Sequence, residues 1–227
     1  MSPGAVPVVA IDGPSGAGKG TVGRQLAARL GWHLLDSGAL YRLTALAGHH
    51  LDPGDVAGHA RLAESLDIRF DTLPDGGERV WLAGEDVSSR LRTEETGAGA
   101  SRVAVWPQVR QALLRRQRDF ARGPGLVADG RDMGTVVFPG ADLKLFLTAT
   151  PEERARRRHK QLKDKGSDVS LAALSREIAA RDAQDAGRAV APLKAADDAL
   201  LLDSTGLSVG EVVERILALG RERGLWR

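Results

Sequence analysis

The 227-residue chain contains no cysteine and no asparagine, and only 4% of its residues are aromatic. Without cysteine it cannot form disulfides, thiolate zinc sites or a cysteine nucleophile, and its five His lack the paired spacing of a metal site. Without asparagine it lacks the guanine-reading Asn-Lys-x-Asp element of regulatory GTPases and the catalytic-loop Asn of protein kinases. The few aromatic residues are not interleaved with basic ones, which argues against stacking on single-stranded nucleic acid.

Long hydrophobic runs are also missing. The longer apolar runs, such as Ala199–Leu202 and Leu143–Leu147, are far shorter than the roughly 18 residues of a membrane span, and the N-terminus lacks the pattern of a signal peptide. We therefore expect a cytoplasmic protein that does not bind membranes. Its net charge is only +2, but 26 of its 32 cations are Arg, whose planar guanidinium suits phosphate. For the arginines on exposed helices, however, composition bias that replaces Lys by Arg is the favoured explanation.

Apolar segments alternate along the chain with segments of helical periodicity, which is typical of a parallel sheet covered by helices. Strands are expected at 6–11, 32–35, 126–128, 143–147 and 200–202. Helices are expected at 21–30, 39–47 and 108–121. The sequence therefore predicts an α/β fold with a five-stranded parallel sheet flanked by helices.

Two regions interrupt this alternation. In the first, the alternating patterns at 67–72 and 79–83 surround a Pro74-Asp75-Gly76-Gly77 turn, which predicts an inserted small antiparallel β subdomain. A helix at 92–105 is also possible there, although Gly97 and Gly99 weaken its pattern. The second region, from 150 to about 188, is nearly all helical in pattern, with a break at Asp164-Lys165-Gly166-Ser167.

A glycine-rich segment directly follows the first expected strand: Gly13, Pro14, Ser15, Gly16, Ala17, Gly18, Lys19, Gly20 and Thr21. Its Gly-x4-Gly-Lys spacing is that of a P-loop, whose backbone N–H groups and helix N-terminus hold phosphate while the Lys reaches the β- and γ-phosphates. Glycine-rich turns also occur for packing reasons, but here strand, turn, Lys and helix all fall where phosphate binding needs them. In the general motif a hydroxyl residue follows the Lys and ligates Mg²⁺, whereas here Gly20 intervenes before Thr21. Direct ligation of Mg²⁺ by this loop is therefore not expected.

Two further motifs lie at expected strand ends, where open α/β sheets bind ligands. They are Asp36-Ser37-Gly38-Ala39-Leu40-Tyr41-Arg42 and Asp129-Gly130-Arg131-Asp132-Met133-Gly134-Thr135. Together with the P-loop and the segment from Arg181-Asp182 to Arg188-Ala189-Val190-Ala191-Pro192-Leu193, they resemble the bacterial cytidylate kinases over about residues 8–213. The Gly-Lys-Gly-Thr form of the P-loop is similar to that of nucleoside monophosphate kinases, which hold the metal mainly through phosphates and water.

The resemblance implies a P-loop NTPase-type enzyme that transfers the γ-phosphoryl of ATP, with Mg²⁺, to CMP or dCMP. It divides a single kinase domain, 1–227, into a core of about 6–51, 107–149 and 189–223, a monophosphate-binding insertion of about 52–106, and a mobile helical lid region of about 150–188. We expect a monomer whose partners are ATP, CMP and dCMP, and not nucleic acid or membrane.

The resemblance also implies which residues surround the acceptor nucleotide. These are Ser37, Tyr41, Arg42, Ser101, Arg110, Asp129, Arg131, Arg181, Asp185 and Arg188. Cytosine recognition would fall to Ser101, Arg110 and Arg188, and ribose recognition to Arg181 and Asp185.

Phosphoryl transfer needs positioned oxygens and neutralised charge more than covalent chemistry. We expect Lys19, Arg131, Asp132 and Arg158 to be catalytic. Lys19 would serve the donor phosphates, and Arg42 and Arg131 the acceptor α-phosphate. Asp132 and Asp36 are candidates for organising Mg²⁺-bound water or the arginines, whereas Asp129 could equally cap its own turn.

The basic residues after Pro151 are expected on one helical face, because they are spaced at i, i+3, i+4 and i+7. They are Arg154, Arg157 and Arg158, and the neutral Gln161 falls on the same face. This face could close over ATP as a lid, or it could be a solvated face paired with nearby acids.

Two other functions remain open from the residues alone. The first is a related small-molecule kinase acting on UMP, AMP or a non-nucleotide acceptor such as shikimate, which Ser101, Arg110, Asp185 and Arg188 would distinguish. The second is a basic P-loop module that binds nucleic acid and uses ATP as a switch, for which salt-dependent binding without CMP-stimulated ATP turnover would be the sign.

Overall fold

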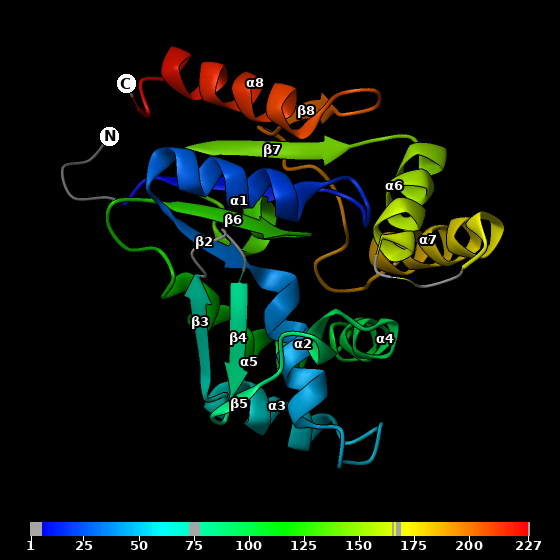
Figure 1. Ribbon diagram of the computed structural model, residues 1–227. Coiled ribbons are helices and arrows are strands. Elements are labelled where there is room, and N and C mark those ends of the chain that lie inside the picture. Colours follow the sequence, from blue (N-terminus) through cyan, green and yellow to red (C-terminus); the bar gives the residue numbers. More distant parts are fainter. Residues whose placement is uncertain (1–5, 73–77, 165, 167–168, 227) are drawn as a thin grey trace. The chain divides into compact units, whose positions relative to one another are not determined.

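The computed structural model describes residues 6–72, 78–164, 166 and 169–226 (Figure 1). The Pro74-Asp75-Gly76-Gly77 turn, and Lys165, Ser167 and Asp168 of the lid region, lie outside the described residues. The chain divides into two compact units. We call Met1–Asp36 with Arg118–Arg227 the P-loop unit, and Ser37–Gln117 the inserted unit.

The P-loop unit is built on a five-stranded sheet with the order β2-β6-β1-β7-β8. Its strands are β1 Val8–Asp12, β2 His33–Asp36, β6 Leu126–Gly130, β7 Leu143–Thr148 and β8 Leu200–Asp203. Every neighbouring pair is parallel, so the predicted five-stranded parallel sheet is confirmed. The register aligns the ends of the three strands β1, β6 and β2, because Asp12 pairs with Gly130 and Asp36 with Asp129. Three carboxylates therefore reach the same edge of the sheet, beside the loop that follows β1.

Two helices cover one face of this sheet and pack against each other, α1 (Lys19–Leu30) and α8 (Val209–Glu222) (Figure 1). Val22 and Leu26 of α1 and Ile216 of α8 are buried with Ile11 and Leu145 of the strands in one apolar core. Strand β1 is buried on both faces, which explains its continuous apolar sequence. The α8 helix begins at a capping box formed by Ser208 and Glu211.

Three further elements complete the P-loop unit. A single π-helical turn, η2 (Met133–Val137), follows β6, and it was not predicted from the sequence. The predicted helices of the lid region are α6 (Pro151–Lys163) and α7 (Leu171–Ala186), which pack side by side (Figure 1). Pro at the first helical position and Thr150 as N-cap start α6, because the Thr hydroxyl accepts the Glu153 amide at 3.3 Å.

The inserted unit contains helices, a 3₁₀ turn and a small antiparallel sheet. The elements are α2 (Ser37–Ala47), α3 (Val56–Ser65), β3 (Ile68–Thr72), β4 (Glu78–Leu82), β5 (Glu85–Asp86), η1 (Arg90–Arg92), α4 (Glu94–Val103) and α5 (Pro107–Arg118), whose last residue belongs to the P-loop unit. The predicted antiparallel pairing of β3 with β4 is confirmed, and β5 adds a third strand. Helix α3 was not predicted.

Helix α4 forms despite its two glycines because they allow it to lie close to α2. A Cβ at Gly97 would stand 3.1 Å from Arg42 Nη2, and one at Gly99 would stand 3.1 Å from the Ala45 Cβ. Close helix packing therefore outweighs the low helix propensity of glycine here. No helix within the described residues is long and apolar enough to span a membrane.

Candidate active site

The P-loop adopts a backbone conformation that only glycine tolerates at several positions. Gly13, Gly16 and Gly18 have φ angles of 149°, 79° and 94°, in the range that L side chains disfavour. A Cβ at Gly13 would also stand 2.0 Å from the carbonyl oxygen of Leu147, so a side chain there would collide with β7. The sequence pattern Gly-x4-Gly-Lys thus corresponds to a tight strand-to-helix turn, as phosphate binding requires.

Lys19 begins α1 and is only 5% exposed. Its ammonium donates a hydrogen bond to the carbonyl oxygen of Pro14 at 2.9 Å, which holds it inside the loop. Burial, and secondly the Arg131 guanidinium, lower the pKa of Lys19 to about 8, against the opposing effect of Asp129 and Asp12. The loop therefore holds a buried cation whose loss of hydration a bound phosphate would offset.

Asp129 lies at the end of β6 beside this lysine and is buried. Burial raises the pKa of its carboxyl to about 7, the nearby Asp36 and Asp12 add to the rise, and Lys19 and Arg131 oppose it. A Cβ placed at Gly20 would stand 3.3 Å from Asp129 Oδ2. The position that carries a metal-binding hydroxyl in the general motif therefore faces a carboxylate in this chain.

Asp12 is the last residue of β1 and accepts two backbone hydrogen bonds from the turn after β6. The amides of Met133 and Gly134 donate to its two carboxylate oxygens, each at 2.8 Å. Burial raises the pKa of Asp12 to about 6, although these two hydrogen bonds lower it. Asp12 thus ties the strand that leads into the P-loop to the segment that carries Arg131 and Asp132.

Arg131 and Arg188 meet at a single buried carboxylate, Asp185 of α7. The Arg131 Nε donates to Asp185 Oδ2 at 2.8 Å, and the Arg188 guanidinium pairs with the other oxygen. Burial raises the pKa of Asp185, but Arg131 and Arg188 lower it more, and the net pKa lies below its usual range. Arg181 adds to this lowering from the same helix. The Nε of Arg188 is buried and has no hydrogen-bond partner within the described part of the chain.

The other predicted acceptor residues lie in the inserted unit, on α2, α4 and α5. Ser37 is buried, and its hydroxyl donates to Gln117 Oε1 at 2.8 Å. Arg42 donates to the carbonyl oxygens of Leu91 and Thr93, at 2.9 and 3.2 Å.

Tyr41, Ser101 and Arg110 complete this group. The Arg110 guanidinium lies 5.7 Å from the centroid of the Tyr41 ring and donates to the carbonyl oxygen of Ala104 at 3.2 Å. The Ser101 hydroxyl donates to Gly97 O at 3.1 Å. Tyr41 and Arg110 are thus brought together, and Ser101 lies one helical turn after the glycine that packs on Arg42.

Known proteins resemble this chain over nearly its whole length. The family model for cytidylate kinase matches residues 9–222. The chain belongs to the cytidylate kinase family. A cytidylate kinase of Pseudomonas paraeruginosa is 60% identical over 97% of this chain and 97% of its own length. One of Pseudomonas aeruginosa is 62% identical over 94% of this chain and 95% of its own, and one of Stutzerimonas stutzeri is 59% identical over 97% of each.

Within this cytidylate kinase family member, the remaining predicted residues are placed as follows. Asp132 is buried and precedes η2, where its carbonyl oxygen accepts the amides of Val136 and Val137. Arg158 lies on α6, half-buried. Lys19, Asp129, Arg131, Asp185 and Arg188 come together in the P-loop unit through direct contact or charge interaction.

Asp12 was not predicted as a site residue from the sequence. The available signal was a carboxylate ending an otherwise apolar strand immediately before the P-loop, a position where burial demands a partner. Its partners, Met133 and Gly134, could not be read from the sequence because they lie 121 and 122 residues away.

A metal site built from protein side chains is not apparent in the part of the chain that the structure describes, where no group of three or more His, Asp or Glu could hold a metal ion. The carboxylates that interact with the P-loop lysine are Asp129, Asp12 and Asp185. They fit a Mg²⁺ ion that arrives on nucleotide phosphates better than one held by the protein alone.

Proposed function

We propose that this protein transfers the γ-phosphoryl group of ATP to CMP or dCMP, giving ADP and CDP or dCDP. The observation that carries this proposal is the buried Lys19 in its P-loop, next to the Arg131–Asp185–Arg188 cluster, in a chain about 60% identical to cytidylate kinases over nearly its whole length. The P-loop supports a phosphate donor, and the cluster supports an anionic acceptor beside it.

Each part of the reaction then has a residue to perform it. Lys19, buried in the loop, neutralises the donor phosphates and the charge of the transferred group. Arg131 is fixed through its Nε by Asp185, which leaves other guanidinium N–H groups for the acceptor α-phosphate. Arg42 is proposed for the same phosphate.

No strong general base is needed, because the attacking acceptor oxygen belongs to a phosphate that is already ionised near neutral pH. Mg²⁺ would accompany ATP and add positive charge at the phosphates, with Asp132 and Asp36 organising the water around it. Arg158 is proposed to add a further cation from α6.

The unpartnered Nε of Arg188 supports base recognition. It is a buried donor without an acceptor within the described residues, and cytosine offers acceptors at O2 and N3. We propose Ser101 and Arg110 as the other cytosine-reading residues, and Arg181 and Asp185 as the ribose-binding ones. The division into core, monophosphate-binding insertion 52–106 and lid 150–188, the monomeric state and the cytoplasmic location stay predictions.

The experiment is a coupled assay of ADP release with CMP, dCMP, UMP and AMP as acceptors. We expect CMP and dCMP to stimulate ATP turnover far more than UMP or AMP. Turnover stimulated best by another acceptor would replace the proposed substrate. ATP turnover indifferent to all four would contradict a nucleotide kinase altogether.

A further inference from the structure

Two arginines of α6 do not reach toward solvent as a lid surface but bind the backbone of the P-loop. Arg154 is 4% exposed, and its Nη1 donates to the carbonyl oxygen of Ser15 at 2.9 Å. Arg157, one turn later, donates to the carbonyl oxygen of Ala17 at 3.3 Å. The backbone of α6 also lies close to the loop, since a Cβ on Gly16 would stand 3.0 Å from the Arg154 Cβ.

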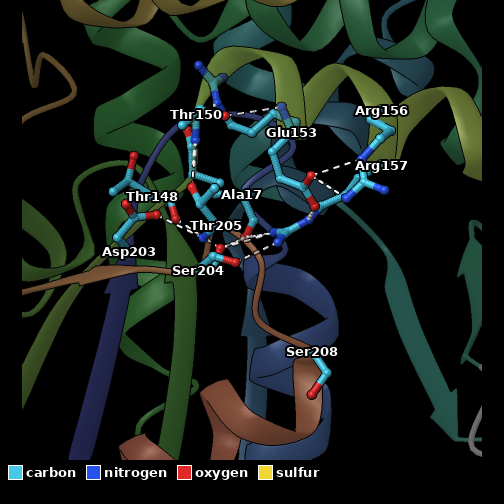
Figure 2. A network of polar contacts seen from close by, with 12 residues as sticks. Ala17, Thr148, Thr150, Glu153, Arg156, Arg157, Asp203, Ser204, Thr205 and Ser208 are labelled. Atoms are coloured by element: carbon cyan, nitrogen blue, oxygen red, sulfur yellow. Dashed lines mark hydrogen bonds and ion pairs between the residues drawn. The ribbon is translucent and has the colours of Figure 1, made fainter.

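A third residue, Ser204, completes the contact with Ala17. It follows β8 and is only 2% exposed. Its hydroxyl lies 3.3 Å from Ala17 O and 2.9 Å from Thr148 O, and it accepts a hydrogen bond from Arg157 Nη1 at 3.0 Å. Arg157 Nη2 donates to Ser204 O at 2.7 Å. The guanidinium of Arg157 therefore binds both Ala17 and Ser204. Figure 2 shows Ala17, Thr148, Arg157 and Ser204 converging in this way.

Holding a carbonyl oxygen also fixes the next amide, because the C=O and N–H of a planar trans peptide point in opposite directions. Arg154 therefore sets the direction of the Gly16 N–H, and Arg157 with Ser204 sets that of the Gly18 N–H. Both glycines have positive φ and would otherwise be the most freely rotating residues of the loop. These N–H groups are the ones that a P-loop presents to phosphate.

We propose that Arg157 and Ser204, with Arg154, are positioning residues that hold the P-loop amides in their phosphate-binding directions from behind. They act through the loop backbone and not by touching the nucleotide. If Arg157 acted only as a positive charge that neutralises phosphate, its hydrogen bonds to Ser204 would not matter for nucleotide binding. If it holds the loop backbone at Ala17, as a clamp, binding depends on the Arg157 guanidinium and the Ser204 hydroxyl together. This inference rests on one part of the proposed function, namely that the P-loop binds a nucleotide.

The test measures ADP binding by calorimetric titration in wild type, Ser204→Ala, Arg157→Ala and the double variant. We expect the Kd for ADP to rise about fivefold in Ser204→Ala and about 10- to 30-fold in Arg157→Ala, as for loss of buried hydrogen bonds. The double variant should be no weaker than about Arg157→Ala alone, because the two residues act as one unit. Arg156→Ala is the matched control: Arg156 is 72% exposed, pairs with the same Glu153 as Arg157, and should leave the Kd within about twofold.

Two results would overturn the proposal: wild-type ADP affinity in Ser204→Ala, or single-variant effects that simply multiply in the double variant. If Ser204→Ala does not fold, the ADP affinity of Arg157→Lys tests the proposal independently. A lysine keeps the charge but cannot span Ala17 O and both Ser204 oxygens, so we expect it to bind ADP several-fold more weakly than wild type. Wild-type affinity in Arg157→Lys would show that charge alone suffices, which also overturns the clamp.

Kinetics add a readout that a merely stabilising contact would not move. The KM for ATP should rise in Ser204→Ala while the KM for CMP stays within about twofold, with melting temperatures compared in parallel. ADP binding does not require an acceptor. A failure of the CMP assay would therefore refute the proposed substrate without deciding the clamp, and the titrations would decide the clamp by themselves.

Discussion

The P-loop unit and the inserted unit hold their functional side chains in different ways. In the P-loop unit, charges are buried and restrained by other charges, as with Lys19 beside Asp129 and Arg131 paired to Asp185. In the inserted unit, Arg42 donates to the carbonyl oxygens of Leu91 and Thr93, and Arg110 donates to that of Ala104 and lies over the Tyr41 ring. Buried charge networks focus electrostatic potential and resist rearrangement, and a guanidinium that binds backbone carbonyls is oriented to present its other N–H groups. The comparison predicts large catalytic losses in the first unit and selective acceptor losses in the second.

The largest loss should follow replacement of the P-loop lysine. Lys19→Ala removes the side-chain cation from the loop, and we expect kcat to fall about 10²- to 10³-fold because catalysis here is electrostatic positioning. Circular dichroism should show an unchanged fold. The exposed Lys194→Ala serves as control for loss of a lysine and should keep its activity. Retention of more than about a tenth of kcat in Lys19→Ala would contradict the donor site.

Arg188 should decide between CMP and UMP. Arginine only donates hydrogen bonds, and uracil presents an N–H at N3 where cytosine presents an acceptor, so a guanidinium at this edge would lose its partner. We expect kcat/KM for CMP to exceed that for UMP by about 10² or more, since such mismatches cost on the order of 1–3 kcal/mol each.

The variant Arg188→Ala should reduce kcat/KM for CMP by about 10²-fold and change that for UMP much less. Steady-state kinetics on both acceptors measures this, with Arg176→Ala as the control, an exposed arginine of α7, the helix that ends just before Arg188. Equal losses on CMP and UMP would assign Arg188 to phosphate binding and remove its cytosine-reading role.

Replacement of Arg42, in the inserted unit, should affect the acceptor alone. Arg42→Ala removes a guanidinium held by the carbonyl oxygens of Leu91 and Thr93, and we expect the KM for CMP to rise about tenfold while the KM for ATP stays unchanged. Arg42→Lys, which keeps the charge without the fork, should recover only part of the loss. An equal rise in both KM values would indicate a general structural effect and break the distinction between the units.

A structural feature of this protein could be predicted from the sequence when the residues that form it lie close together along the chain. The parallel strands and the P-loop were predictable because apolar runs and the Gly-x4-Gly-Lys spacing are local signals. Helix α4 forms although its glycines lower the helix propensity of the segment, because those glycines allow close packing against Arg42 and Ala45, which the sequence does not reveal. Asp12 and Ser204 were not predicted as site residues because their partners lie far away in the sequence. Ser204, for example, contacts Ala17 across 187 residues. Arg157 was expected on an exposed or phosphate-facing surface, and only the fold shows it behind the loop.

The smallest predicted effect concerns the pH dependence of stability, and it tests whether the P-loop unit truly restrains buried charge. The pKa of Asp129 is about 7 in the folded protein and near 3.8 in an unfolded chain. Between these values the folded state binds more protons, so the free energy of unfolding should fall as the pH rises from about 4 to 7. Lys19 has the opposite sign at higher pH: its pKa is about 8 when folded and 10.5 when unfolded, so its contribution to stability rises with pH between those values.

Asp129→Asn removes the titrating carboxyl and should flatten the decline between pH 5 and 7 by about 1 kcal/mol or more. Urea unfolding of wild type and Asp129→Asn at pH 5, 6, 7 and 8 measures the difference, with the exposed Glu64→Gln as control for loss of a carboxylate. Because the difference between the two proteins is used, titrations of groups that do not interact with Asp129 cancel, whereas those of its neighbours Lys19 and Asp12 contribute to the difference. Unfolding free energies of Asp129→Asn that run parallel to wild type would mean that Asp129 is ionised throughout this range, already neutralised by Lys19 and Arg131. The buried charges of the P-loop unit would then be balanced before any nucleotide binds, and the contrast with the inserted unit would lose its electrostatic basis.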